Sequence, residues 1–247
     1  MPSIYMKFVQ ELPEVLAAKT SRPVHVRQRS SEPSNALKTN STLTTLILDG
    51  NLIGEGEVQA LSRALKTNST LITLNIGRTS IGDNGAVALA EALKTNSILT
   101  TLTLHHISIR DNGVAALSET LKTNSSLITL NMRNASIETN GAQAPAEALK
   151  TNSTLTTLNL TLCSIGDYGT QALGAKALAE ALKTNSTLTT LGLTNAFIGF
   201  DGARALAEAL KTNSTLITLD LQYTSIGDYA AQALSEALKI NSTIIDV

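Results

Sequence analysis

The sequence has few of the residue types that several classes of protein require. Its 247 residues include one Cys, no Trp and only 3 % aromatic residues. A single Cys cannot form an internal disulfide, which excludes a disulfide-stapled secreted domain. The 19 Lys and Arg residues against 20 Asp and Glu residues give a net charge of −1, so the basic excess that neutralises nucleic-acid phosphates is missing. No apolar run approaches the roughly 20 residues of a membrane span. We therefore expect neither nucleic acid as a partner nor a membrane-spanning segment.

What the sequence has instead is one unit repeated along most of its length. The string Ala-Leu-Lys-Thr-Asn-Ser-Thr-Leu recurs with small changes, and its successive starts lie 28 residues apart except for one interval of 33. The starts are Ala36, Ala64, Ala92, Thr120, Ala148, Ala181, Ala209 and Ala237. We therefore divide the chain into a non-repeat segment, 1–35, and a repeat domain, 36–247, with seven full units and a truncated eighth. A fixed period of this length indicates a solenoid.

Within a unit the spacing of apolar residues changes from two to three or four. Alternation over 73–77 predicts a short strand. Ala86, Leu89 and Leu93 then follow at the spacing of an amphipathic helix. We expect Asp83 to cap the start of this helix and Asn96 to end it in a left-handed conformation. A strand and a helix in every unit predict parallel strands on one face and helices on the other.

The motif Leu43-x-x-Leu46-x-Leu48-x-x-Asn51, followed by Ile53 and a helix, resembles the leucine-rich repeat. The 28-residue period is similar to that of the ribonuclease-inhibitor-type subfamily. This resemblance implies an α/β solenoid, a horseshoe with a parallel sheet on its concave face and helices on its convex face. It also implies a ladder of polar side chains at the Asn or Cys position of the motif. That position holds Asn51, Thr79, Ile107, Ala135, Cys163, Ala196 and Thr224, so the chain departs from the ladder over most of its length.

The two ends and the middle depart from the regular unit. Helical spacing of Ile4, Phe8 and Leu12 favours an amphipathic cap at the start, followed by a linker over 20–35. At the other end the repeat stops inside a unit, which predicts end-to-end self-association or a larger chain. In the fourth helix Pro145 replaces a core Leu, which would cost about 3 kcal/mol inside a helix. We place the five extra residues of the longer unit at 174–178.

Side chains that could perform catalysis are scarce and poorly placed. His105 and His106 are neighbours on a strand, so we expect their side chains to diverge and bind no metal. Cys163 has no His in its own or neighbouring units to activate it. Most Asn-x-Ser/Thr sequences repeat one turn, so we interpret them as turns and not as glycosylation sites. We expect no enzyme activity, no cofactor and a cytoplasmic location.

Sequence variation among the units indicates where a partner binds. Helix and turn residues barely change, whereas the pair of residues at the end of each strand differs every time. A uniform scaffold with a varied face predicts recognition of a protein partner, and neutral drift at exposed positions is the alternative. The concave-face candidates are Asp49, Arg78, His105, His106, Arg133, Asn134, Leu162, Asn195, Asp220, Gln222 and Tyr223. Aromatic side chains at the loop edge supply a second candidate set, Tyr168, Phe200 and Tyr229.

The resemblance leaves several functions open beside a plain binding module. It suggests the sensing region of an innate-immunity receptor, a GTPase-activating repeat protein like the Ran regulator, or an enzyme inhibitor. An inhibitor of a basic enzyme would need an acidic concave face, and only Asp49 and Asp220 are expected there. A microbial effector that acts on host proteins is a further alternative and would place the chain in the host cytoplasm.

Overall fold

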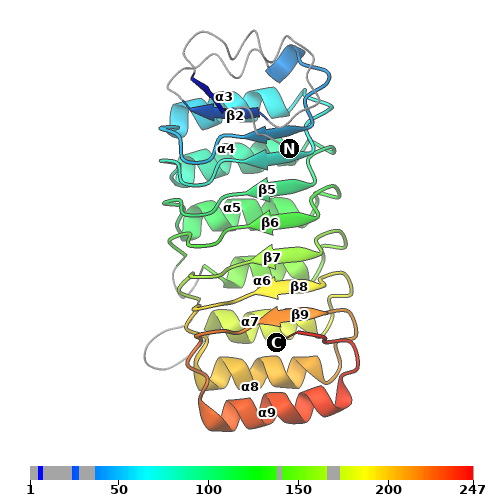
Figure 1. The fold of residues 1–247 in the computed structure, drawn as a ribbon. Coiled ribbons are helices and arrows are strands. Elements are labelled where there is room, and N and C mark those ends of the chain that lie inside the picture. The colour runs from blue at the N-terminus through cyan, green and yellow to red at the C-terminus, as the bar shows by residue number, and fades with distance from the viewer. Residues whose placement is uncertain (1–4, 8–23, 28–36, 138–140, 166–172, 247) are drawn as a thin grey trace.

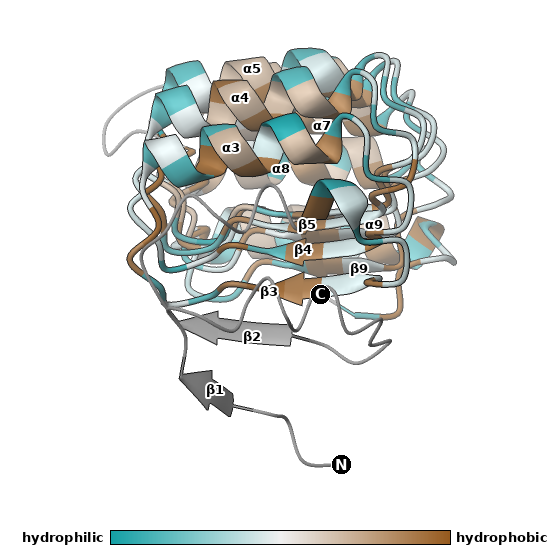
Figure 2. Ribbon diagram, turned by 90° about the horizontal axis from the view of Figure 1, so that it is seen from above, coloured by the Kyte–Doolittle hydropathy of each residue, from teal (hydrophilic) through white to brown (hydrophobic). Residues whose placement is uncertain are grey.

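The fold has two layers, a parallel sheet and a row of helices. The computed structural model describes residues 5–7, 24–27, 37–137, 141–165 and 173–246. The strands are β1 (Tyr5–Lys7), β2 (Val24–Arg27), β3 (Thr45–Ile47), β4 (Thr73–Asn75), β5 (Thr101–Thr103), β6 (Thr129–Asn131), β7 (Thr157–Asn159), β8 (Thr190–Gly192) and β9 (Thr218–Asp220). The helices are α3 (Glu55–Leu65), α4 (Asp83–Leu93), α5 (Asp111–Leu121), α6 (Gln143–Leu149), α7 (Leu173–Leu182), α8 (Gly199–Leu210) and α9 (Gly227–Ile240). Strands follow one another in chain order across the sheet (Figure 1), and the helices cover one face of it (Figure 2). We call the other face the sheet face.

Strand register follows from the repeat. The first residue of every strand from β3 to β9 is Thr, and these threonines pair with one another across the sheet. Because side chains alternate along a strand, the middle Leu of each strand points towards the helices. Leu74 and Leu89, from strand and helix of one unit, are both fully buried. The predicted α/β leucine-rich-repeat solenoid is confirmed.

A ladder of buried Asn side chains joins the units on the side where each helix ends. In Asn124, Nδ2 donates to the carbonyl of Leu93, the last residue of α4, at 2.8 Å, and Oδ1 accepts from the N–H of Leu127 at 2.8 Å. The side chain thus satisfies a helix carbonyl that lacks a partner within its own helix. The same two kinds of bond recur in each unit, at Asn68, Asn96, Asn124, Asn152, Asn185, Asn213 and Asn241.

This ladder confirms the turn interpretation of the repeated Asn-x-Ser/Thr sequences, because their amide groups are engaged inside the protein. The expected left-handed conformation of Asn96 is wrong, since that residue is absent from the left-handed residues of the described chain. Its side chain, and not its backbone angle, makes Asn suitable there. The other expected cap also differs: Asp83 Oδ1 accepts from the N–H groups of Arg110 and Gly113, at 2.8 and 3.0 Å. Asp83 therefore caps the next helix, α5, and not its own.

The expected N-terminal helix is wrong at the residues that the structure describes there. Tyr5–Lys7 and Val24–Arg27 are strands that pair in parallel with each other, and β2 pairs with β3. The open edge of β3 offers unpaired backbone groups, which a further strand satisfies. The expected linker is therefore wrong at β2. The rest of segment 1–35 lies outside the described residues, and the division of the chain at residue 36 stays a prediction.

The middle of the chain departs from the regular unit near the starts of α6 and α7. Helix α6 begins only at Gln143, so Pro145 lies in the first turn, where its missing N–H has no helical partner to lose. The expected cost of a proline inside a helix is therefore avoided by shortening the helix. In α7, Gly174, Ala175 and Leu178 are buried and occupy the positions of an ordinary unit. Residues 174–178 are therefore not the extra ones, and the expected place of the five extra residues is wrong.

Replacing Pro145 with Leu should stabilise the chain. Leu89 at the equivalent position of α4 is fully buried, and a Leu at 145 would restore the apolar side chain of an ordinary unit. We expect the free energy of unfolding to rise by about 1 kcal/mol. Urea denaturation with an unchanged m-value measures this, and a loss of stability would show that α6 has no room for the larger side chain.

No helix within the described part of the chain is long and apolar enough to cross a bilayer.

Candidate protein-binding surface

The strand ends form a row of residues in a strained backbone conformation. Each of the seven units from β3 to β9 has a pair of residues after its strand, and the second residue of every pair has a positive φ of 50–70°. The row consists of Gly50, Arg78, His106, Asn134, Leu162, Asn195 and Tyr223; we call it the exit row. The same backbone hydrogen bond recurs at each turn. From Gly50 to Asn195, the N–H of each exit-row residue donates to the carbonyl of the first residue of the pair in the next unit, at 2.7–3.0 Å.

Three members of the exit row are residue types that this conformation disfavours. Gly has no Cβ to clash in the left-handed region, and Asn and His occur there more often than other residue types. The chain uses Gly50, His106, Asn134 and Asn195 at four positions but Arg, Leu and Tyr at the others. A left-handed residue with a Cβ costs of order 1–2 kcal/mol. The side chains at those three positions are therefore kept at the expense of backbone stability, which directs attention to what they contact outside the chain.

Replacing Tyr223 with Asn isolates this cost, because the Tyr223 side chain is 81 % exposed and gives up almost no packing. We expect the free energy of unfolding to rise by about 1 kcal/mol. Tyr229, which is 79 % exposed on α9, is the matched control. Its replacement by Asn should give no gain, since its backbone is already helical. Equal effects of the two substitutions in thermal or urea unfolding would rule out backbone strain at Tyr223.

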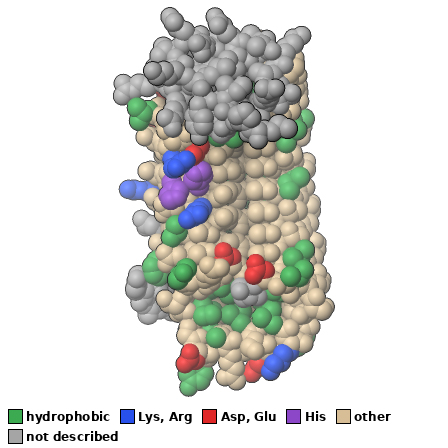
Figure 3. Space-filling model, viewed as in Figure 1, with side chains coloured by type: hydrophobic (Ala, Val, Ile, Leu, Met, Phe, Trp, Pro, Cys, Tyr) green, Lys and Arg blue, Asp and Glu red, His purple; other side chains and the backbone are tan. Residues whose placement is uncertain are grey.

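Three side chains from three units meet at one carboxylate. Arg78 Nε donates to both oxygens of Asp49, at 3.2 and 3.1 Å, and its Nη2 also contacts Oδ2. His105 Nε2 lies 3.1 Å from Asp49 Oδ1. The hydrogen bond from Arg78 is the largest cause of a pKa of Asp49 below its ordinary value, with His105 adding to it. In Figure 3 the histidines and the basic and acidic side chains beside them gather on one part of the sheet face.

His105 reaches Asp49 because the unit between them has a glycine at the intervening position. A Cβ on Gly77 would lie 2.3 Å from the His105 ring, too close for the ring to stay in place. Burial lowers the pKa of His105, and this effect together with the nearby cations outweighs the attraction of Asp49. Its neighbour His106 stands edge-on to it, with ring centroids 5.5 Å apart. The prediction that the two side chains diverge is therefore wrong, because the left-handed backbone at His106 turns that residue.

The lowered pKa of His105 predicts an acid-sensitive fold. Its folded-state pKa lies below that of the unfolded chain, so protons bind the unfolded state first and favour unfolding as the pH falls below about 6.5. The pKa of Asp49 is also lowered, but its contribution is lost only near or below about pH 4. We expect His105→Gln to flatten the decline in unfolding free energy between about pH 7 and pH 5. Parallel pH profiles of the variant and the natural chain, by urea denaturation, would contradict this assignment.

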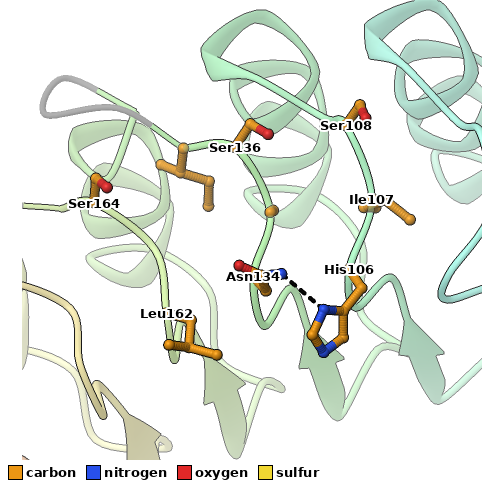
Figure 4. A pocket seen from close by; sticks show the side chains of 9 residues that line it. His106, Ile107, Ser108, Asn134, Ser136, Leu162 and Ser164 are labelled. Carbon is orange, nitrogen blue, oxygen red and sulfur yellow. Dashed lines mark hydrogen bonds between the residues drawn. The ribbon is translucent and has the colours of Figure 1, made fainter.

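Beside the exit row lies an open groove of about 620 Å³. His106, Asn134 and Leu162 line it at the strand ends, and Ser108, Ser136 and Ser164 line it further along the connections to the helices (Figure 4). Asn134 Nδ2 lies 2.7 Å from His106 Nδ1. The groove thus has polar side chains from three successive units, together with the apolar side chains of Ile107, Ala135, Ile137 and Leu162.

The remaining sequence candidates are separate from this cluster. Asp220 Oδ1 accepts from the N–H of Gln222 at 3.2 Å, as Asn75, Asn131 and Asn159 do two residues before their own exit pairs. Asp220 thus has a structural role in its turn. Phe200, on α8, is 45 % exposed. The guanidinium carbon of Arg204 lies over the Phe200 ring, 5.6 Å from the ring centroid. Tyr168 lies outside the described residues, and no ring contact joins Phe200 to Tyr229 among those described.

The sequence interpretation missed Gly77 and the three groove serines. Asp49, Gly77 and His105 occupy the same position in three successive units. A glycine between an acidic and a basic residue in this row was the signal that His105 reaches over the middle unit to Asp49. Ser108, Ser136 and Ser164 recur at one position, and a repeated polar residue beside a varied pair was the signal for the groove.

Three segments of the sequence match the family described as Leucine Rich repeat, at residues 67–90, 151–174 and 212–235. Each segment runs from the turn of the Asn ladder through a strand and its exit pair, and the parallel sheet faced by helices agrees with them. The chain folds as a leucine-rich repeat solenoid.

Solved structures are similar to this chain. The tropomodulin C-terminal domain of Caenorhabditis elegans is 20 % identical with a TM-score of 0.50, over 63 % of this chain and 92 % of that chain. That likeness shows the fold alone and transfers no partner. Leiomodin-1 actin-binding site 2 is 23 % identical with a TM-score of 0.43, over 65 % of this chain and 76 % of that chain. A search of curated proteins finds no match.

Proposed function

We propose that this leucine-rich repeat chain is a non-catalytic module that binds a protein partner through its exit row and the adjoining groove. The observation that carries the proposal is the row itself. At three of its seven positions, Arg78, Leu162 and Tyr223, the chain holds a side chain that its backbone disfavours, although Gly, Asn or His occurs at the other four. A solenoid under no demand except folding gains stability by using Gly or Asn at these positions. A binding role gives a reason for the three departures.

One row of the sheet face is uniform. The first residue of each strand is Thr in every unit from β3 to β9, so this row offers a partner nothing that distinguishes one unit from the next. The exit pairs differ in each unit and hold charged, apolar and aromatic side chains. Specific recognition needs such differences, and central aromatic or Arg anchors contribute most of the affinity in protein interfaces.

Site-specific photocrosslinking tests the proposal. A photoreactive residue at Leu162 or Tyr223 should capture one protein from the native cells, and an excess of unmodified chain should compete for it. The same residue at Val87, which is 41 % exposed on α4 in the helix layer, is the control. Capture at Val87 and not at Leu162 or Tyr223 would place the interface on the other layer and overturn the proposal.

Further parts of the proposal concern subfamily, location and assembly. The 28-residue period supports the ribonuclease-inhibitor-type subfamily. The engaged amides of the Asn ladder remove glycosylation as a reason to expect secretion, which supports a cytoplasmic location.

Exposure of Ile240 and Ile245, at 65 % and 84 %, supports end-to-end self-association. Sedimentation of Ile245→Lys against the natural chain tests this, and identical molar masses at all concentrations would contradict it.

A further inference from the structure

Basic side chains gather in the exit pairs on one half of the solenoid, beside a single acidic one. The seven pairs contain one acidic residue, Asp49, while Arg78, His105, His106 and Arg133 belong to three successive pairs that follow it. The last three pairs hold no charged side chain. This local excess of basic groups stands on a chain whose net charge is −1. The overall charge therefore hides a basic region at the strand ends.

The only acidic member of the exit pairs is already engaged within the chain. Asp49 is 14 % exposed and receives Arg78 on both oxygens and His105 on one. A carboxylate with these partners has little capacity left for a cation from outside. The guanidinium of Arg78 remains 61 % exposed beside it, so the outer surface of this cluster presents donors and not acceptors.

Arg133 and His106 are the donors that face outward in the neighbouring units. Arg133 is exposed and has no ion-pair partner among the described residues. His106 is exposed, and because the Asn134 amide donates to its Nδ1, its own proton lies on Nε2. Ser108, Ser136 and Ser164 add hydroxyl donors along the groove behind them. These groups together match the acceptor oxygens of several carboxylates.

Resting on the proposed function, we infer that the basic half of the exit pairs, which holds Arg78, His105, His106 and Arg133, binds an acidic segment of a partner protein. Arg133 and His106 contact carboxylates directly, and the groove takes up the side chains that carry them. Asp49 and Gly77 act as positioning residues, since they hold Arg78 and His105 in place. Leu162 at the end of the groove marks the change from charged to apolar contacts.

An NMR titration tests the inference with a defined probe. The isotope-labelled full chain is titrated with a short peptide of alternating Glu and Ser, and with a peptide of alternating Lys and Ser. The acidic peptide should shift the amides of His106, Asn134 and Ser136, whereas the basic peptide should not.

Charge reversal supplies matched variants. Arg133→Glu should weaken binding of the acidic peptide about tenfold. Arg63→Glu changes the same charge on α3, in the helix layer, and should leave binding unchanged. Both variants should keep the amide dispersion of a folded chain. Equal losses in the two variants, or peptide-induced shifts confined to residues outside the exit pairs and the groove, would overturn the inference, as would tighter binding of a single-stranded RNA of equal charge.

Failure of this inference and failure of the proposed function are distinguishable. If Arg133→Glu leaves photocrosslinked capture at Leu162 and Tyr223 intact, the exit row binds protein but not through acidic groups. If capture at those positions is absent while the acidic peptide still binds at His106, the basic region exists without the proposed module. Loss of capture and of peptide binding together in Arg133→Glu supports both.

Discussion

Replacing Asn124 with Ala lowers the free energy of unfolding by about 4 kcal/mol, the largest stability effect that we expect from one substitution. The side chain is buried, donates to the carbonyls of Leu93 and Asn96 at 2.8 and 3.2 Å, and accepts from the N–H groups of Ser126 and Leu127 at 3.1 and 2.8 Å. Ala leaves these backbone groups without partners in a site closed to water. Each unsatisfied buried group costs about 1–3 kcal/mol, partly relieved by relaxation.

The control for this substitution is Asn84→Ala on α4. Asn84 is exposed and makes one side-chain hydrogen bond, to Glu55 at 3.0 Å. We expect a change below about 0.5 kcal/mol. Urea denaturation of both variants measures the difference between them. A small effect at Asn124 would mean that the ladder does not hold the units together.

Replacing Leu162 and Tyr223 together with Asn weakens partner binding about 100-fold. The substitution removes both side chains from the exit row. The Asn that replaces each of them is a residue type that the row already holds at Asn134 and Asn195. Stability should therefore rise or stay level while affinity falls. This separates a binding role from a structural one, because loss of a structural residue lowers both.

The measurement for the double variant uses the protein captured at Tyr223, with affinity by titration calorimetry and stability by urea denaturation. The matched control replaces Val87 on α4 with Asn, which removes an exposed apolar side chain in the helix layer, outside both candidate sets. An unchanged affinity in the Leu162 and Tyr223 variant would remove the C-terminal half of the row from the interface. A fall in stability would show that the two side chains pack against the chain.

Most of the architecture could be predicted because the repeat samples one solution many times. The apolar spacing of Leu74 and Leu89 defines which sides of strand and helix face each other, and stacking of identical units supplies the rest. The prediction went wrong where a contact crosses from one unit to the next. Asp83 caps α5 and not α4, because its carboxylate accepts from N–H groups at the start of α5, one unit further along the chain. Spacing within a unit contains no information about such contacts.

The candidate site was located by sequence variation but its physical character was not. The exit pairs were identified as varied, yet nothing in a sequence states that Leu162 or Tyr223 has a positive φ, because both residue types usually avoid it. Tertiary hydrogen bonds to the next unit impose that angle. The Asp49, Arg78 and His105 cluster likewise depends on Gly77 leaving room across a unit, which becomes evident only in three dimensions.

The central claim is that the strained exit row is the surface that contacts a protein partner. Hydroxyl-radical footprinting of the chain with and without the captured partner tests it most directly, because it reports the solvent exposure of individual side chains. We predict that His106, Leu162 and Tyr223 become protected when the partner binds, while Val87 on α4 keeps its reactivity. Protection of Val87 with unchanged reactivity at all three exit-row side chains would contradict the claim.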